Sequence, residues 1–112
     1  MADASIWNGR AFSENGKIRY GKVSFKVKGN GVLDFEIDGV PTYSGCNGFR
    51  PVAVDKKIRI KSSGVFYKEY VPLPGYNDTI YVWGKIKGSS ARGYFRTFGL
   101  CPSVGIFKAS RG

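Results

Sequence analysis

Residues 22–38 read KVSFKVKGNGVLDFEID, and this stretch sets the class of fold. Apolar and polar side chains alternate before and after Gly29-Asn30-Gly31, which is the period of a β-strand with one buried face. The sequence therefore predicts a β-hairpin. Its buried face would carry Val23, Phe25 and Val27 on the first strand and Leu33, Phe35 and Ile37 on the second.

The length of the turn follows from the register of the two strands. A two-residue loop at Gly29-Asn30 would place Lys26 opposite Leu33 and mix the two faces. A three-residue loop that ends at Gly31 pairs apolar residues with apolar ones, and it forms two Lys–Asp pairs on the outer face. We therefore predict the three-residue loop, with Gly31 in the left-handed conformation. The predicted pairs are Lys26–Asp34, Phe25–Phe35, Ser24–Glu36, Val23–Ile37 and Lys22–Asp38.

A second hairpin is predicted over residues 79–98, around a turn at Gly88-Ser89. Its predicted core pairs are Ile86–Ala91, Gly84–Gly93, Val82–Phe95 and Ile80–Thr97. The outer face then carries Tyr81, Trp83, Lys85, Arg92, Tyr94 and Arg96. The solvent face of a sheet seldom combines three large aromatic side chains with three cations, so this face is the candidate binding site.

Two interpretations of this face stay open. Aromatic rings can stack on bases or sugars while arginines hold anionic groups. Alternatively, the face packs inside a second layer or a subunit interface, with its cations at the edge. Residues 92–98 are superficially similar to the RNP1 strand of RNA-recognition domains, but Tyr94 and Phe95 are adjacent and so point to opposite faces. We therefore reject that motif.

The rest of the chain also favours short strands. Further strands are predicted near Ile6–Phe12, Val52–Ile60, Val65–Val71 and Val104–Ala109, with a turn at Asp55–Lys57 inside the second of them. Seven to nine short strands separated by turn signals are typical of a sandwich or barrel. We predict one all-β domain over residues 1–112, an antiparallel β-sandwich or jelly-roll-like fold.

Composition limits the chemistry. The formal net charge is +10, and the chain contains no histidine. A catalytic triad with histidine and a histidine-ligated metal are therefore excluded, and we expect no enzymatic activity, no metal and no cofactor. The basic excess favours polyanionic partners: an anionic polysaccharide, the cell wall, a nucleic acid or an anionic lipid. The alternative is a cationic surface that only keeps the protein soluble.

Cys46 and Cys101 are the only cysteines. Neither has a histidine to act as its base, and the CxxC spacing of redox pairs is absent. Each lies beside glycine or proline at the end of a predicted strand, so we predict a Cys46–Cys101 disulfide; two unpaired thiols remain the alternative. Such a disulfide contributes roughly 4 kcal/mol in the chain-entropy model. It also indicates an oxidising compartment.

The ends of the chain and its hydropathy bear on localisation. The first residues, MADAS, have neither a basic n-region nor an apolar h-region, and no apolar run approaches the ~20 residues of a membrane span. We therefore expect no signal peptide in this chain and no transmembrane segment. The predicted disulfide nevertheless indicates an extracellular protein.

Several short motifs together resemble small secreted β-rich domains of unknown function that are common in Actinobacteria. The matching segments are Gly9–Phe12, Val23–Val27, Gly64–Phe66, Val82–Ile86, Ala91–Phe95 and Cys101. The chain departs from that group after Cys101, where Pro-Ser-Val-Gly and Ile106–Ala109 replace the usual Cys-x-Ser/Thr-Gly and Trp-x-Ala. The resemblance implies the β fold, secretion and the disulfide, and it implies no activity.

The sequence thus predicts a secreted binding module that recognises an anionic polymer or a cell-surface partner. The binding residues would be those of the aromatic and basic face of the second hairpin. The alternative is a structural or assembly subunit that uses the same face to bind another protein or a second copy of itself.

Overall fold

The computed structural model describes residues 4–42, 49–71, 79–99 and 102–112. Within these ranges nine strands form one antiparallel sheet. The strands are β1 (Ser5–Phe12), β2 (Arg19–Lys28), β3 (Gly31–Pro41), β4 (Phe49–Val54), β5 (Ile58–Arg59), β6 (Val65–Tyr70), β7 (Ile80–Lys87), β8 (Ser90–Thr97) and β9 (Ser103–Arg111). No helix in the described ranges is long and apolar enough to cross a membrane.

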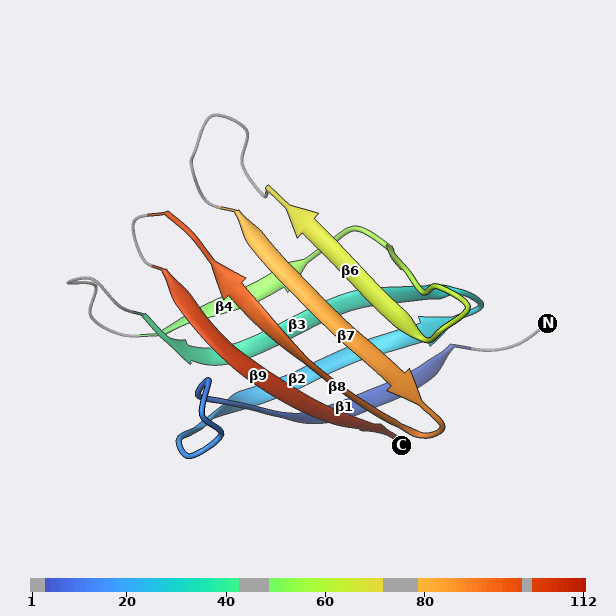
Figure 1. Cartoon of the computed structure of the whole chain (residues 1–112), viewed down its shortest axis with the longest axis horizontal. Helices are drawn as coiled ribbons and strands as arrows, with labels where there is room; N and C mark the ends of the chain where they lie inside the picture. The colour runs from blue at the N-terminus through green and yellow to red at the C-terminus, as the bar shows by residue number, and fades with distance from the viewer. Residues whose placement is uncertain (1–3, 43–48, 72–78, 100–101) are drawn as a thin grey trace.

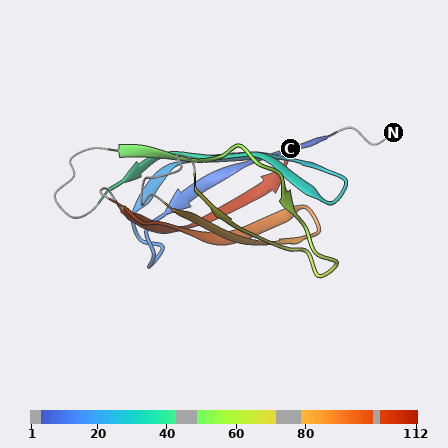
Figure 2. The same ribbon diagram turned by 90° about the horizontal axis from the view of Figure 1, so that it is seen from above.

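The sheet curls back on itself until it nearly closes. Its order is β4-β3-β2-β1-β9-β8-β7-β6, with β5 also paired to β3, so most strands pair with their neighbours in the chain and the first pairs with the last. Figures 1 and 2 show β1–β4 and β6–β9 as two layers. On the side away from β1 and β9, a bridge between Ile60 and Phe66 brings the edges of the two layers together.

This topology confirms the all-β, antiparallel prediction and the number of strands. It does not confirm the finer prediction of a sandwich or jelly roll. A sandwich has two separate sheets, whereas here β1 and β9 join the two layers by a continuous ladder. A jelly roll needs Greek-key crossovers, whereas these strands follow one another around a barrel-like sheet. The predicted turn at Asp55–Lys57 separates β4 from β5.

The first hairpin forms with a different turn from the predicted one. Lys26 pairs with Leu33 across a two-residue turn, and Gly29, not Gly31, has a positive φ of 60°. Further from the turn, Ser24 pairs with Glu36 as predicted, so the register shifts between the two sites. The predicted three-residue loop is therefore wrong.

A β-bulge at Asp34 causes this shift. Asp34 is the only described residue other than glycine with a positive φ, 53°, and it places one extra residue on β3 opposite β2. The extra residue turns Val32 into the core in place of Leu33, which is only partly buried. The predicted Lys26–Asp34 ion pair still forms, with an Nζ–Oδ2 distance of 3.8 Å, although the two residues are not directly opposite.

The second hairpin has the predicted register throughout. Gly88 has a φ of 62° at the start of the two-residue turn, and all four predicted core pairs are present. Every outward position of β7 and β8 is therefore the one expected from the sequence.

Aromatic rings fill the space between the two layers. Phe25 packs between Trp7 and Phe35, with ring centroids 5.6 and 5.8 Å away. The ring of Phe107 on β9 contacts those of Phe35 on β3 and Phe66 on β6, with centroids 5.3 and 6.4 Å away. Because side chains fill this interior, a binding site made by the described residues lies on the outer surface.

Three inward-facing glycines make room for these rings. The cross-strand pairs are Gly84–Phe66, Gly93–Phe107 and Gly105–Phe95. A Cβ atom at Gly84 would lie 2.2 Å from the ring of Phe66. Each glycine thus lets an aromatic ring from the neighbouring strand lie across the backbone.

Cys46 and Cys101 lie outside the described residues, and their disulfide stays a prediction.

Candidate functional site

The outer face of β6–β9 and β1 aligns side chains in rows that run across the strands. The first of these, here called the aromatic row, has one residue on each of five neighbouring strands. Its members, in spatial order, are Tyr67, Trp83, Tyr94, Ile106 and Phe12. Each is directly opposite the next, so together they form a continuous apolar strip.

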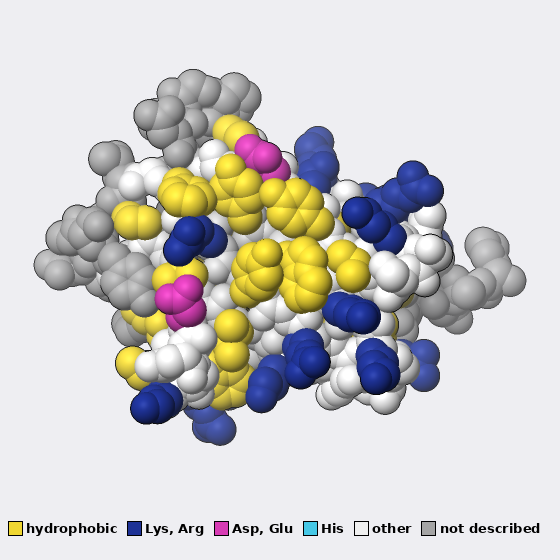
Figure 3. Space-filling model, in the orientation of Figure 1, with side chains coloured by type: hydrophobic (Ala, Val, Ile, Leu, Met, Phe, Trp, Pro, Cys, Tyr) yellow, Lys and Arg dark blue, Asp and Glu magenta, His cyan; other side chains and the backbone are white. Residues whose placement is uncertain are grey.

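The centre of the aromatic row is a stacked pair. The rings of Trp83 and Tyr94 have centroids 5.4 Å apart and planes inclined by 15°. Tyr67 and Tyr94 are 48% and 49% exposed, which is high for aromatic side chains on a packed sheet. In Figure 3 apolar side chains cover much of this face. The rings of Tyr67 and Tyr94 are therefore available to a ligand, whereas Trp83 is partly exposed.

A second row, here called the cation row, runs parallel to the first. It consists of Lys85, Arg92, Lys108, Arg10 and Lys22, one on each of β7, β8, β9, β1 and β2. On β7, β8, β9 and β1 each cation lies two residues from a member of the aromatic row. Figure 3 shows Lys and Arg side chains bordering the apolar patch.

No side chain of the cation row forms an ion pair with a described residue, although the backbone N–H of Lys22, at its end, donates a hydrogen bond of 2.6 Å to the carboxylate of Asp38. Among the described residues the one ion pair, Lys26–Asp34, lies elsewhere. One nitrogen of the Arg10 guanidinium already has a partner, because Nη1 donates a hydrogen bond of 3.0 Å to the carbonyl oxygen of Tyr20. Lys108 places its Nζ 5.9 Å from the ring centroid of Phe12, in the aromatic row. Like charges directly opposite one another destabilise a sheet, so this row reduces the stability of the free protein.

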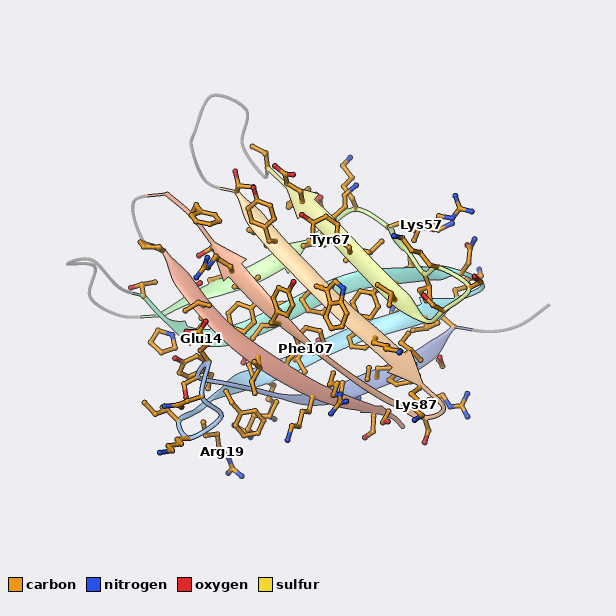
Figure 4. All side chains as sticks on the ribbon, viewed as in Figure 1. Glu14, Arg19, Lys57, Tyr67, Lys87 and Phe107 are labelled. Carbon is orange, nitrogen blue, oxygen red and sulfur yellow. The ribbon has the colours of Figure 1, made fainter. Side chains whose placement is uncertain are left out.

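Two grooves follow these rows. One of about 440 Å³ is lined by Lys85, Lys87, Arg92 and Lys108 beside the β7–β8 turn. The other, of about 610 Å³, lies over the aromatic row and is lined by Tyr67, Tyr81, Tyr94, Phe98 and Ile106, with Glu14 and Arg96 at its border. Figure 4 places Tyr67 and Glu14 on this side of the molecule.

The remaining predicted residues, Tyr81 and Arg96, form a third environment. They are paired across β7 and β8, and the Tyr81 hydroxyl donates a hydrogen bond of 3.2 Å to Glu69. Burial, followed by this hydrogen bond, raises the pKa of Tyr81, so the hydroxyl stays protonated at neutral pH. The guanidinium of Arg96 lies 5.6 Å from the ring centroid of Phe98, which is 44% exposed.

All six residues predicted for the site lie on one outer face, but in three rows with different surroundings. Trp83 and Tyr94 belong to the aromatic row, and Lys85 and Arg92 belong to the cation row. Tyr81 and Arg96 lie nearer to the carboxylate of Glu69. Arg92 is therefore a better candidate than Arg96 for holding an anionic group.

Sequence reasoning missed the residues that lengthen both rows. Tyr67, Ile106 and Phe12 extend the aromatic row, while Lys108, Arg10 and Lys22 extend the cation row. Their strands were predicted, and the alternation along 104–109 marks Ile106 and Lys108 as facing one way. The missing information was the strand order, which two isolated hairpins do not define.

No protein-family model and no curated protein matches this chain. The resemblance to small secreted actinobacterial domains therefore stays a prediction, and the function must be argued from the site.

Proposed function

We propose that this protein is a non-enzymatic, secreted binding module that recognises an anionic polymer through the outer face of β6–β9 and β1. The observation that carries the proposal is the cation row. Lys85, Arg92 and Lys108 lie directly opposite one another on three neighbouring strands without an acidic partner in the described residues. An anionic ligand would relieve their repulsion, so the arrangement is costly in the free protein and favourable in a complex.

The whole chain supports the same class of ligand. A net charge of +10 attracts polyanions over a distance set by salt, about 8–10 Å at 0.10–0.15 M ionic strength. The linear arrangement of the cations matches an extended polymer better than a compact anion, because the row spans five strands.

The proposal is tested by removing two central cations together. Arg92→Ala with Lys108→Ala should weaken binding to an acidic polysaccharide, to purified cell walls or to nucleic acid by about tenfold near 0.15 M salt, since two ionic contacts are lost. Binding is measured by titration of labelled polymer. Arg59→Ala with Lys28→Ala is the matched control, because it removes the same charge from exposed positions outside both rows.

If the two double variants lose the same amount of affinity, binding depends on the total charge of the protein and not on the cation row. If the wild-type protein binds none of the three polymers, the proposed function is wrong.

A second candidate function is assembly through the aromatic row. The exposure of Tyr67, Tyr94 and Phe98 favours it, because large exposed apolar patches often mark protein interfaces. A self-associating face would give a dimer in sedimentation velocity that Tyr94→Ser removes. A monomer at every concentration, together with polymer binding, supports the binding module instead.

Secretion is part of the proposal and depends on the predicted disulfide. Alkylation of Cys46 and Cys101 should occur only after reduction, as intact-mass spectrometry would show. Reduction should lower the free energy of unfolding by about 2–4 kcal/mol, because the unfolded chain gains freedom. Alkylation of both thiols in the native, unreduced protein would contradict the disulfide and remove the argument for an extracellular location.

A further inference from the structure

We infer that the anionic polymer is a single-stranded nucleic acid, which crosses β7, β8, β9 and β1 with its phosphates on the cation row and its bases on the aromatic row. This inference rests on the proposed function and names its ligand. It is carried by the relation between the two rows, not by either row alone.

On each of four strands an apolar residue of the aromatic row lies two positions from a cation, and this apolar residue is aromatic on β7, β8 and β1 and aliphatic on β9. The pairs are Trp83 with Lys85 on β7, Tyr94 with Arg92 on β8, Ile106 with Lys108 on β9 and Phe12 with Arg10 on β1. Within each pair the two residues are two positions apart, or about 7 Å along the strand. A nucleotide likewise has a flat base at one end, which could contact the apolar residue, and a charged phosphate at the other, which could contact the cation.

This separation favours a nucleic acid over an acidic polysaccharide. In a polysaccharide the charge is attached to the sugar ring that would stack on an aromatic side chain, so charge and stacking surface would fall on the same row. Here they lie on separate, parallel rows from β6 to β1, and a cation, Arg19 on β2, is directly opposite Phe12 only at the end of the aromatic row. Proteins that bind single strands combine these two elements, a basic track for the backbone and aromatic rings for the bases.

The rows also favour a single strand over a duplex. The bases of a duplex are stacked in its interior, so its outer surface offers phosphates to the cation row and leaves the aromatic row without a partner. A single strand is flexible enough to follow the curved outer surface from β7 to β1, where the sheet turns from one layer to the other (Figures 1 and 2).

The first experiment compares ligands at equal salt. Labelled oligothymidylates of about 4–16 nucleotides are titrated by fluorescence anisotropy. A DNA duplex and heparin are titrated under the same conditions. We expect the single strand to bind at least about tenfold more tightly than the duplex. The logarithm of its affinity should fall with the logarithm of salt concentration with a slope of about −2 to −3.5, as expected for three to five phosphate contacts.

The second experiment separates stacking from charge. Trp83→Ala should weaken oligothymidylate binding by about 5- to 150-fold, because stacking of a base on an aromatic ring is lost. Its salt slope should stay unchanged, since no phosphate contact is removed. Trp83→Phe should retain most of the affinity, which also controls for folding. Lys108→Ala should instead reduce the steepness of the slope by about 0.7.

Tryptophan fluorescence gives an independent signal. The chain has two tryptophans, and Trp7 is buried in the core at 2% exposure. Trp83 is therefore the tryptophan on which a base can stack. Oligothymidylate should quench the emission of the wild-type protein and leave that of Trp83→Phe unchanged.

The possible failures are distinguishable. Equal or tighter binding of the duplex or of heparin would overturn the inference and leave the proposed function standing. The same holds if Trp83→Ala binds oligothymidylate as tightly as the wild type while Lys108→Ala binds it more weakly. If no polyanion binds at all, the inference and the proposed function fail together.

Discussion

Replacing Phe107 with alanine should lower the free energy of unfolding by about 3–5 kcal/mol. Phe107 is fully buried, its ring lies across Gly93, and it contacts Phe35 of the opposite layer with centroids 5.3 Å apart. Alanine would leave a cavity at the place where the two layers meet, and the glycine beneath it carries no side chain to fill the space. The loss is a large part of the 5–15 kcal/mol that stabilises a typical domain.

The measurement is denaturant unfolding followed by far-UV circular dichroism. Phe98→Ala is the matched control, because it removes the same ring from a position that is 44% exposed. We expect this control to lose about 1 kcal/mol or less, mainly from the edge contact with Tyr81, whose ring centroid lies 5.4 Å away. A loss for Phe107→Ala as small as that for Phe98→Ala would contradict the assigned core.

The two hairpins show what local sequence can and cannot predict. The β7–β8 register follows from unbroken alternation on both sides of Gly88, and the structure has that register. The predicted β2–β3 register is wrong only near the turn, because Asp34 adopts a left-handed conformation and forms a bulge there. Aspartate adopts this conformation more readily than most residues, but nothing in the alternation around it indicates a bulge. A three-residue loop gives the same pairs far from the turn, such as Ser24–Glu36, without a bulge. The alternation in the sequence therefore favoured that loop.

The candidate site shows the same limit on a larger scale. Its centre, Trp83 and Tyr94 with Lys85 and Arg92, comes from one hairpin and was predictable from alternation. Its extension through Lys108 to Arg10 depends on the pairing of β9 with β8 and β1, which lie far apart in the chain. Non-local pairing of this kind leaves no local pattern, and only the closure of the sheet turns separate cations into a row.

The cation row predicts that stability and binding will change in opposite directions. Arg92 lies directly between Lys85 and Lys108, so Arg92→Glu would replace two like-charge pairs with two opposite-charge pairs. Each such cross-strand pair contributes roughly 0.2–1 kcal/mol, which predicts a gain of about 1 kcal/mol in the free energy of unfolding. The gain should shrink in 1 M salt, because surface charges are then screened.

The same substitution should weaken polyanion binding by at least about tenfold near 0.15 M salt, because an attractive contact becomes a repulsive one. Arg59→Glu is the control: it makes the same change of charge on β5, opposite Gly31, and should alter affinity much less and stability little. Most damaging substitutions lower stability and function together. A variant that is more stable and binds less tightly is expected only where a cluster of like charges is kept for a ligand. If Arg92→Glu lowers the free energy of unfolding, or binds polyanions as the wild type does, the cation row is not such a cluster.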